Sequence, residues 1–331
     1  MRCIADKGLD PHFNLAAEEF LLTRCTGPVF RLWRNSPSII IGKNQNAAAE
    51  INAKFVHEHN IPVVRRLTGG GAVFHDLGNI NFTFVDAKVP GEDTSAMFAR
   101  FTAPIIQALK KLGIDASLQG RNDLLIDGRK FSGNAICVHK ERVLQHGTLM
   151  FSASISDLSG ALNARPEKFI GKSVQSNRSR VTNISEHLPE PMDIERFMDF
   201  IFSEISDGTA SDFTEDEVAA ITALRDEKYA TQGWNWGTSP KYTYSNSVKL
   251  PSGLVEIFLN VEKGIIRECR ICGDYFFTAP TSELEEALVG VLNRYDDIFA
   301  AVSTIDINSY ISGMTPEIFT DLIQTSSHPQ D

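Results

Sequence analysis

The triple glycine Gly69-Gly70-Gly71 is the feature that most restricts how this chain can fold. It stands in the segment RRLTGGGAVFHD, residues 65–76, between two short apolar runs. Consecutive glycines let a backbone turn sharply and present its N–H groups to an anion. No Gly-Lys-Ser/Thr closes the run and the glycines are contiguous, so the segment is neither a P-loop nor a dinucleotide-binding turn. We expect a ligand-binding loop between strands, with Arg65 and Arg66 available for a phosphate or carboxylate. A glycine-rich hairpin with solvated arginines is the alternative.

Strand-like and helix-like segments alternate around this loop. Strands are expected at 29–33, 38–41, 62–66, 72–75, 80–85, 123–127, 130–138 and 143–151. Helices are expected at 14–25, 46–57, 94–112, 193–206 and 214–229. Asn14 is the expected N-cap of the first helix, and Thr214 with Glu217 forms a capping box. Within 80–85, Ile80, Phe82 and Phe84 alternate with polar residues, the pattern of a half-buried strand.

A smaller unit is expected after the segment QGWNWGTSP, residues 232–240. Two strands, at 253–261 and 265–272, are joined by Lys263-Gly264, and helices follow from Ser282 onward. Thr315-Pro316 begins the last helix, because proline suits the first helical position. The pattern predicts an α+β fold with a large domain, residues 1–245, and a small α+β domain, residues 246–331.

Composition excludes several classes of protein. The net charge of −10 argues against a non-specific nucleic-acid binder. Five cysteines at scattered spacing form a poor disulfide framework, which favours a reducing compartment. Cys269 and Cys272 have the spacing of half a zinc site without a second pair, so we interpret them as strand residues. No apolar run is long enough to span a membrane and no apolar signal segment begins the chain, so a cytoplasmic protein is expected.

Three further segments carry candidate chemistry. Lys130 follows a tight turn in GRNDLLIDGRKFSGNA, residues 120–135, and precedes a small Ser-Gly pair that would leave room for its ammonium. His146 stands before a glycine inside an expected strand. A Ser/Asn-rich loop, residues 172–184, holds three cations and could cover a ligand. The alternatives are a solvated lysine, a core histidine and an ordinary basic loop.

Together these blocks resemble the lipoate–protein ligase family, within the group that also includes octanoyltransferases and biotin ligases. The resemblance runs in order through RRLTGGGAVFHDLGNINFTF, GRNDLLIDGRKFSGNA, HGTLMF, KSVQSNRSRVTNI and WNWGTSP and covers nearly the whole chain. It implies a large biotin/lipoate-ligase-like domain with mixed sheets and flanking helices. It also implies two half-reactions: ATP and lipoate form lipoyl-AMP and pyrophosphate, and an acceptor lysine then takes the lipoyl group.

The resemblance carries roles over to individual residues. Lys130 would bridge the carboxylate and the α-phosphate. The ATP and lipoyl-AMP site would comprise Arg66, Thr68, Gly71, Ala72, Val73, Phe74, His75, Asn79, Asn122, Asp123, Lys130, His146, Gly147, Lys172, Arg178 and Arg180. The lipoate site would comprise Arg66, Thr68, Lys130 and His146. Leu67 and Thr68 depart from the residues common in related ligases, but both neighbouring arginines remain.

ATP with Mg²⁺ and lipoate are the expected substrates, with the metal near Asp123 and without a tightly bound prosthetic group. The expected acceptors are lipoyl domains of 2-oxoacid dehydrogenase complexes and the glycine-cleavage H protein. Neither a nucleic acid nor a membrane is an expected partner, and a monomer is expected.

Three rival functions remain. A lipoyl or octanoyl transferase would use a pre-activated donor, and relatives that form a thioester need a cysteine. A biotin ligase would differ in its glycine-rich loop, whereas here His75-Asp76 continues to Gly78-Asn79 as in lipoate enzymes. A non-catalytic lipoate- or nucleotide-binding protein is the third, although no part of the motif is missing.

Overall fold

The computed structural model describes residues 1–45, 47–51, 56, 59–154, 181–207, 210–236, 244–262 and 264–324. A seven-stranded sheet has the order β1-β2-β6-β10-β9-β8-β7, and a three-stranded sheet has the order β4-β3-β5. The strands are β1 Arg2–Ala5, β2 Val29–Arg34, β3 Ser38–Ile41, β4 Val63–Arg65, β5 Val73–His75, β6 Asn79–Ala87, β7 Ala116–Gln119, β8 Asp123–Ile126, β9 Arg129–His139 and β10 Arg142–Met150. The helices are α1 Pro11–Arg24, α2 Ala47–Glu50, α4 Thr94–Lys111, α6 Ile194–Ser206, α7 Glu215–Leu224 and α8 Gln232–Trp236, with η3 Ile184–His187 and η4 Arg225–Tyr229.

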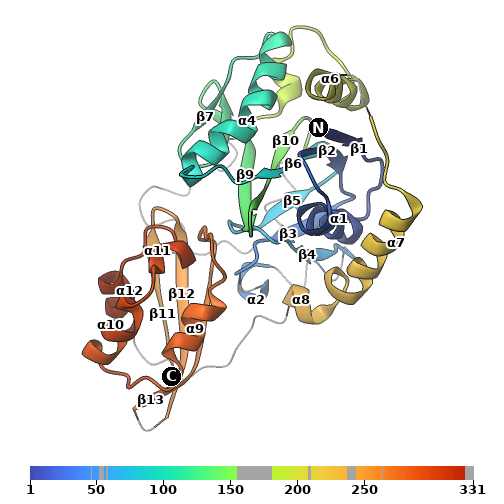
Figure 1. Ribbon diagram of the computed structural model, residues 1–331. Helices are drawn as coiled ribbons and strands as arrows, with labels where there is room; N and C mark the ends of the chain where they lie inside the picture. The colour runs from blue at the N-terminus through green and yellow to red at the C-terminus, as the bar shows by residue number, and fades with distance from the viewer. Residues whose placement is uncertain are drawn as a thin grey trace.

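Both faces of the seven-stranded sheet are covered (Figure 1). On one face, Phe30, Phe82 and Phe84 pack with the apolar stripes of α4 and α6 in the largest core cluster. On the other face, Leu21 and Leu22 of α1 join a second cluster with strands of the same sheet. Strand β6 is therefore buried on both sides along most of its length, and the expectation of a half-buried strand is wrong. Its polar row faces the protein interior, because α1 and the smaller sheet cover that side.

Helix α1 begins earlier than expected. The Asp10 side chain accepts a hydrogen bond from the His12 backbone N–H, and Pro11 occupies the first turn. Asn14, the expected N-cap, lies inside the helix with its side chain fully buried. The expected capping box of Thr214 and Glu217 is confirmed at the start of α7. Residues 46–57 are described only in part, and α2 covers Ala47–Glu50 within them.

The C-terminal unit is a three-stranded antiparallel sheet with helices (Figure 1). Its elements are β11 Tyr244–Leu250, β12 Gly253–Glu262, β13 Ile265–Gly273, α9 Ser282–Leu288, α10 Tyr295–Ser303, α11 Ile307–Tyr310 and α12 Pro316–Gln324. The expected hairpin of β12 and β13 is confirmed. Strand β11 is not among the expected strands, because its sequence, YSNSVKL, lacks an apolar run. Along this strand, exposed residues alternate with half-buried ones, so one face is open to solvent. The expected division after residue 245 lies within the first residues of this strand.

One aromatic side chain joins the C-terminal unit to the large domain. Phe276, just after β13, belongs to the core cluster of the large domain. Its ring meets Phe98 of α4 edge-on at 5.9 Å between centroids, and the Arg121 guanidinium lies 4.6 Å from the ring centroid. The Gly273 N–H also donates to the Asn44 carbonyl at 2.8 Å. This hydrogen bond joins the end of β13 to the turn that follows β3.

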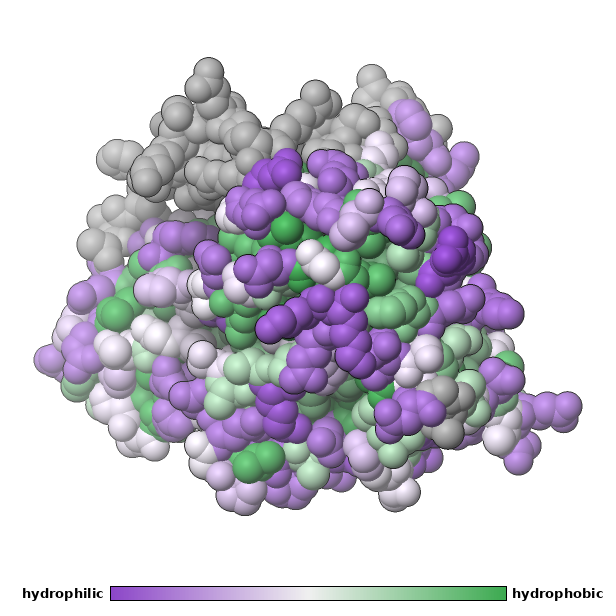
Figure 2. Space-filling view, turned by 90° about the horizontal axis from the view of Figure 1, so that it is seen from above, coloured by the Kyte–Doolittle hydropathy of each residue, from purple (hydrophilic) through white to green (hydrophobic). Residues whose placement is uncertain are grey.

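Figure 2 looks down on the face that carries α4 and α6, where hydrophobic surface shows between hydrophilic stretches. Met198, Phe202 and Ile205 of α6 are half-buried hydrophobic residues that pack against the core below. None of the helices among the described residues combines the length and apolar character that crossing a bilayer requires.

Truncating Phe276 tests the joint between the two units. We expect Phe276→Ala to lower the free energy of unfolding by about 3 kcal/mol, because a buried ring is removed from a packed core. Val289→Ala is the matched control in the same unit, since Val289 is 52% exposed and should change stability little. Urea unfolding followed by tryptophan fluorescence measures both. Equal stability of the two variants would contradict the anchoring role.

Candidate functional site

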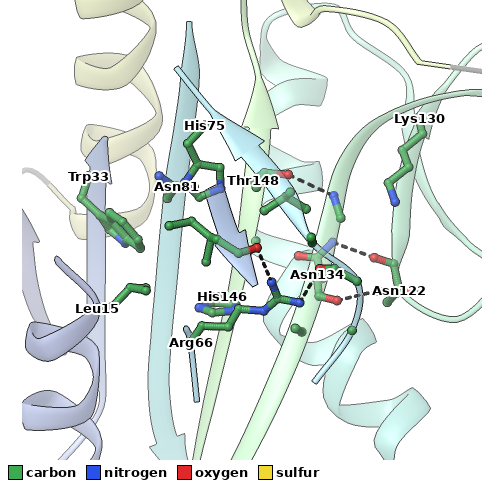
Figure 3. A pocket seen from close by; sticks show the side chains of 18 residues that line it. Leu15, Trp33, Arg66, His75, Asn81, Asn122, Lys130, Asn134, His146 and Thr148 are labelled. Atoms are coloured by element: carbon green, nitrogen blue, oxygen red, sulfur yellow. Dashed lines mark hydrogen bonds between the residues drawn. The ribbon is translucent and has the colours of Figure 1, made fainter. Parts of the chain in front are cut away.

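A cavity of about 210 Å³ lies between the seven-stranded sheet, helix α1 and the glycine-rich loop (Figure 3). Strands β6, β9 and β10 supply one wall through Asn81, Asn134 and Thr148. The loop after β4 supplies the opposite wall through Gly70 and Gly71. The cavity is thus built from segments far apart in the sequence. The glycine-rich loop connects β4 to β5, so the three-stranded sheet determines where this loop lies.

Arg66 fixes the shape of the glycine-rich loop. Its side chain is 6% exposed and donates to the carbonyl oxygens of Ile40, Gly69 and Gly71 at 3.1, 2.6 and 2.9 Å. Its Nε donates to the Thr68 hydroxyl at 2.9 Å. Burial lowers the Arg66 pKa to about 10, so the guanidinium stays charged at neutral pH. Most of its donors serve the loop, while the side chain still borders the cavity.

Arg65 differs from its neighbour. It is 2% exposed and donates to five backbone carbonyls, those of Gly42, Lys43, Gln45, Trp234 and Asn235. The expectation that both arginines pair with a ligand anion is therefore wrong for Arg65. Arg65 ends β4 and bonds away from the cavity, whereas Arg66 follows the strand and lines the cavity.

A buried hydrogen-bond network reaches from the loop to helix α1. The Thr68 hydroxyl lies 2.8 Å from His146 Nε2, and His146 Nδ1 lies 2.9 Å from the Glu18 carboxylate. Glu18 is 3% exposed and also accepts from the Thr83 hydroxyl at 2.6 Å. Thr83 in turn accepts from the Trp33 indole N–H at 2.8 Å. The network holds the His146 ring in one orientation at the cavity wall.

Gly147 leaves space for the Phe82 and Asn134 side chains on the two neighbouring strands. A Cβ atom at this position would lie 2.2 Å from Asn134 Oδ1 and 2.5 Å from the Phe82 ring. Asn134 is itself fixed, because its Oδ1 accepts from Gln145 Nε2 at 2.7 Å and its Nδ2 donates to the Asn122 carbonyl at 3.0 Å. No other residue type fits beside the packed Asn134 amide.

Lys130 lies at the edge of the cavity on β9. Its Nζ is 2.7 Å from Asp123 Oδ1, and its side chain is 40% exposed. A Cβ at position 133 would stand 3.2 Å from the Lys130 Nζ, so Gly133 leaves room for the ammonium. Lys130 and Asp123, for which we expected separate roles, form one ion pair. A ligand anion would compete with Asp123 for this cation.

The structure sorts the expected site residues into three groups. Those that line the cavity are Arg66, Gly71, Ala72, Val73, His75, Asn122, Lys130, His146 and Gly147. Those behind the cavity wall or beside it are Thr68, Phe74, Asn79 and Asp123. Lys172, Arg178 and Arg180 lie outside the described residues.

Several residues that line the cavity were not among the expected site residues. They are Leu15, Trp33, Ile40, Gly70, Asn81, Gly133, Asn134, Ala135 and Thr148, with Glu18 behind His146. Two of them left a signal in the sequence. Glu18 interrupts an otherwise apolar helix stripe that includes Leu15 and Leu22, and Asn81 alternates with large apolar residues in β6. A polar group on an element buried on both faces marks a functional interior.

None of the five cysteines lines the cavity. Cys137 comes nearest in sequence to the site, but it packs in the apolar cluster with Leu21, Leu22 and Leu144. Burial raises its pKa to about 11, so its thiol is a poor nucleophile at neutral pH. The site therefore does not offer a cysteine for a thioester intermediate. Cys269 and Cys272 lie in β13, as expected.

Comparison with known proteins places the chain in a family. The model described as Lipoyl protein ligase A/B catalytic domain matches residues 10–206, and the model described as Bacterial lipoate protein ligase C-terminus matches residues 239–323. The lipoate-protein ligase LplJ of Bacillus subtilis is 43% identical over 322 residues, which cover 95% of this chain and 97% of that protein. The chain belongs to the lipoate–protein ligase family.

Solved structures of similar fold agree with this assignment. P. falciparum LipL1 in complex with lipoate has a TM-score of 0.76 at 26% identity and covers 97% of both chains. A lipoate-protein ligase A bound with ATP has a TM-score of 0.62 at 26% identity and covers 72% of this chain and 99% of that one. A bi-partite lipoate protein ligase from Thermoplasma acidophilum, described with its E2 lipoyl domain, has a TM-score of 0.65 at 29% identity and covers 73% and 98%.

Replacing Gly147 should disturb the packing between β10 and its neighbouring strands. We expect Gly147→Ala to destabilise the fold by about 1–3 kcal/mol through overpacking against Asn134 and Phe82. Gly233→Ala is the matched control, because a Cβ there meets nothing within 4 Å. Thermal unfolding of both variants is the measurement. A Gly147 variant as stable as the Gly233 variant would refute the close packing.

His75 should stay neutral where free histidines titrate. Burial, with the nearby Arg66 and His146 as smaller causes, lowers its pKa to about 3. The unfolded chain binds this proton below pH ~6.5, so the folded state loses stability as pH falls from there towards 3. We expect ¹⁵N-histidine spectra between pH 5 and 8 to show an unchanged neutral ring for His75. A midpoint near 6.5 would contradict the burial argument.

Proposed function

We propose that this chain activates lipoate with MgATP and transfers the lipoyl group to a lysine of a lipoyl domain. The observation that carries the proposal is Lys130 at the edge of the cavity, in a chain whose family is that of the lipoate–protein ligases. The similarity to structures described with lipoate and with ATP supports both substrates. The pairing of a related ligase with its E2 lipoyl domain supports the class of acceptor.

The first half-reaction brings two anions together. A carboxylate oxygen attacks the α-phosphorus, a P–O bond breaks, and pyrophosphate leaves with its electron pair. Like charges must be neutralised and aligned for this step. Lys130 provides a cation that can exchange Asp123 for the incoming carboxylate and α-phosphate oxygens. Asn122, whose amide borders the cavity beside Asn134, provides a neutral donor nearby.

The glycine-rich loop would bind the nucleotide side of lipoyl-AMP. Gly71, Ala72 and Val73 line the cavity, and Arg66 donates a hydrogen bond to the Gly71 carbonyl. Phe74 and Asn79 would lie next to the nucleotide site. Asp123 would bind the magnesium ion that ATP carries. We also propose Lys172, Arg178 and Arg180 as residues of the loop that would cover the adenylate. Thr68 acts through His146 and Arg66.

In the second half-reaction the acceptor lysine amine attacks the acyl carbon. A C–N bond forms, the acyl–phosphate bond breaks, the amine loses a proton, and AMP leaves. We propose the lipoyl domains of 2-oxoacid dehydrogenase complexes and the glycine-cleavage H protein as acceptors, with the ligase acting as a monomer in the cytoplasm. The two family matches support the proposed division into residues 1–245 and 246–331.

Pyrophosphate release from purified protein with ATP, magnesium and lipoate tests the proposal. An apo lipoyl domain is then added and its intact mass is measured. Pyrophosphate release followed by a lipoyl mass gain is the expected result. Modification from supplied lipoyl-AMP without pyrophosphate release would instead identify a transferase that uses a pre-activated donor.

Lys130 should be essential for the first half-reaction. We expect Lys130→Ala to lower kcat/KM for pyrophosphate release by about 10²–10³-fold, the usual effect of removing a charge-stabilising donor. Lys110→Ala is the matched control, since Lys110 is exposed on α4. Circular dichroism checks that both variants fold. Normal pyrophosphate release by the Lys130 variant would assign the lysine another role.

A further inference from the structure

The ion pair of Lys130 and Asp123 lies at the open edge of the cavity. The two side chains are 40% and 37% exposed, and Lys130 Nζ lies 2.7 Å from Asp123 Oδ1. On the opposite side of the cavity, Trp33 and His75 are buried (Figure 3). A lysine side chain that belongs to another protein can therefore enter beside the ion pair, whereas Trp33 and His75 close the other side.

The proposed first half-reaction separates this ion pair. Lys130 exchanges Asp123 for the oxygens that become the acyl phosphate of lipoyl-AMP. The magnesium ion that Asp123 would bind arrives with ATP, and the second half-reaction consumes no ATP. The neighbouring Arg121 does not replace Lys130, because its guanidinium lies over the Phe276 ring, 4.6 Å from the ring centroid. The Asp123 carboxylate thus loses its ammonium partner at the edge where the acceptor lysine enters.

Strand β8 holds Asp123 beside a space that an amino group can fill. Asp123 is the cross-strand partner of Gly133 on β9, and Gly133 lines the cavity. Cross-strand partners lie on the same face of a sheet. Because Gly133 has no side chain, the end of the Lys130 side chain occupies the space above it, with Nζ 3.2 Å from where a Cβ would stand. When Lys130 turns to the acyl phosphate, this space can hold a second amino group.

Other carboxylates near the site are placed less well to meet an incoming lysine. Among the described residues, the side chains that line the cavity include no aspartate or glutamate. Glu18 lies behind His146 and is 3% exposed. Asp274 lies near the glycine-rich loop, but its Oδ1 accepts a hydrogen bond from the Leu254 backbone N–H in its own C-terminal unit. Asp123 is therefore the carboxylate best placed to receive the acceptor lysine.

A carboxylate in this place would align an amine for attack. It accepts a hydrogen bond from an amine N–H, which leaves the nitrogen lone pair free to face the acyl carbon. The neutral amine then forms the C–N bond, the bond from the acyl carbon to the phosphate oxygen breaks with its electron pair on AMP, and the proton passes to water at the exposed edge. Asp123 keeps its charge throughout, so its part is to capture and align the lysine.

We propose that Asp123 forms the acceptor-lysine site of this protein. After lipoyl-AMP has formed, the carboxylate exchanges Lys130 for the amino group of the incoming lysine and holds that group over Gly133. The inference rests on the proposed function, because Lys130 must first move to the acyl phosphate. It gives Asp123 a role in the second half-reaction, in addition to its proposed place beside magnesium in the first.

Supplying lipoyl-AMP directly separates this role from the first half-reaction. The full-length protein receives lipoyl-AMP and either an apo lipoyl domain or hydroxylamine, a small neutral amine that needs no carboxylate to capture it. We expect Asp123→Asn to lower kcat/KM for the lipoyl domain by about 10–100-fold, the effect of losing a charge-assisted hydrogen bond. The rate of hydroxamate formation should stay close to that of the wild type, since Lys130 still binds the acyl phosphate.

Asp127→Asn is the matched control, because Asp127 is on the same hairpin, is 78% exposed and loses the same charge. Its left-handed φ of 49° also suits asparagine. An Asp123 variant that modifies the lipoyl domain at the wild-type rate would overturn the inference alone, and so would an equal loss of rate with both nucleophiles. If the wild-type protein transfers nothing from lipoyl-AMP, the proposed second half-reaction is rejected and the inference with it.

A binding measurement on the wild-type protein decides the question if Asp123→Asn does not fold. The protein is loaded with a sulfamoyl analogue of lipoyl-AMP, which cannot transfer its acyl group. Calorimetry then compares the apo lipoyl domain with a lipoyl domain that carries methionine in place of the acceptor lysine. We expect the lysine to strengthen binding several-fold through its contact with the Asp123 carboxylate. Equal affinities of the two domains would overturn the inference.

Discussion

The buried guanidinium of Arg66 is the interaction on which the site depends. A triple glycine has no side chains to hold its shape, so its carbonyls must be held from outside. Arg66 donates to two of them and to Ile40 of the smaller sheet, which ties the loop to a strand. A buried charge is costly unless its donors are satisfied, and here the loop satisfies most of them. The loop and the arginine therefore stabilise each other.

The same guanidinium connects the loop to the large sheet. Through Thr68 and His146 the hydrogen bonds continue to the buried Glu18 carboxylate on α1. Glu18 offsets part of the desolvation of Arg66. Hydrogen bonds through Thr68 and His146 connect these two opposite charges and hold the His146 ring in one orientation. The cavity wall is thus rigid before a ligand enters.

Polar residues line the cavity on two sides. Lys130 and Asn122 line one side of the cavity, whereas His75 and Asn81 line the side beside Trp33. Lys130, His75 and Asn81 are on strands, which hold side chains more rigidly than loops do. Phe276 brings the C-terminal unit against the glycine-rich loop, where the Tyr275 carbonyl lies 2.4 Å from where a Cβ of Gly69 would stand. The loop is therefore confined from both domains.

The sequence by itself determined most local elements and the residue types of the site. Apolar periodicity located α4 and α6, and the turn residues Gly128-Arg129 located the hairpin of β8 and β9, because the spacing and chemistry within one segment set these elements. The triple glycine predicted the ligand-binding loop, and the order of the sequence motifs along the chain indicated the family. The partner of each buried polar group was decided by tertiary structure. Glu18 and His146 are 128 residues apart, and Arg65 binds Asn235 across 170. Local pattern cannot show which of two adjacent arginines faces the cavity, or that β6 is covered on both faces, because packing of distant segments decides both.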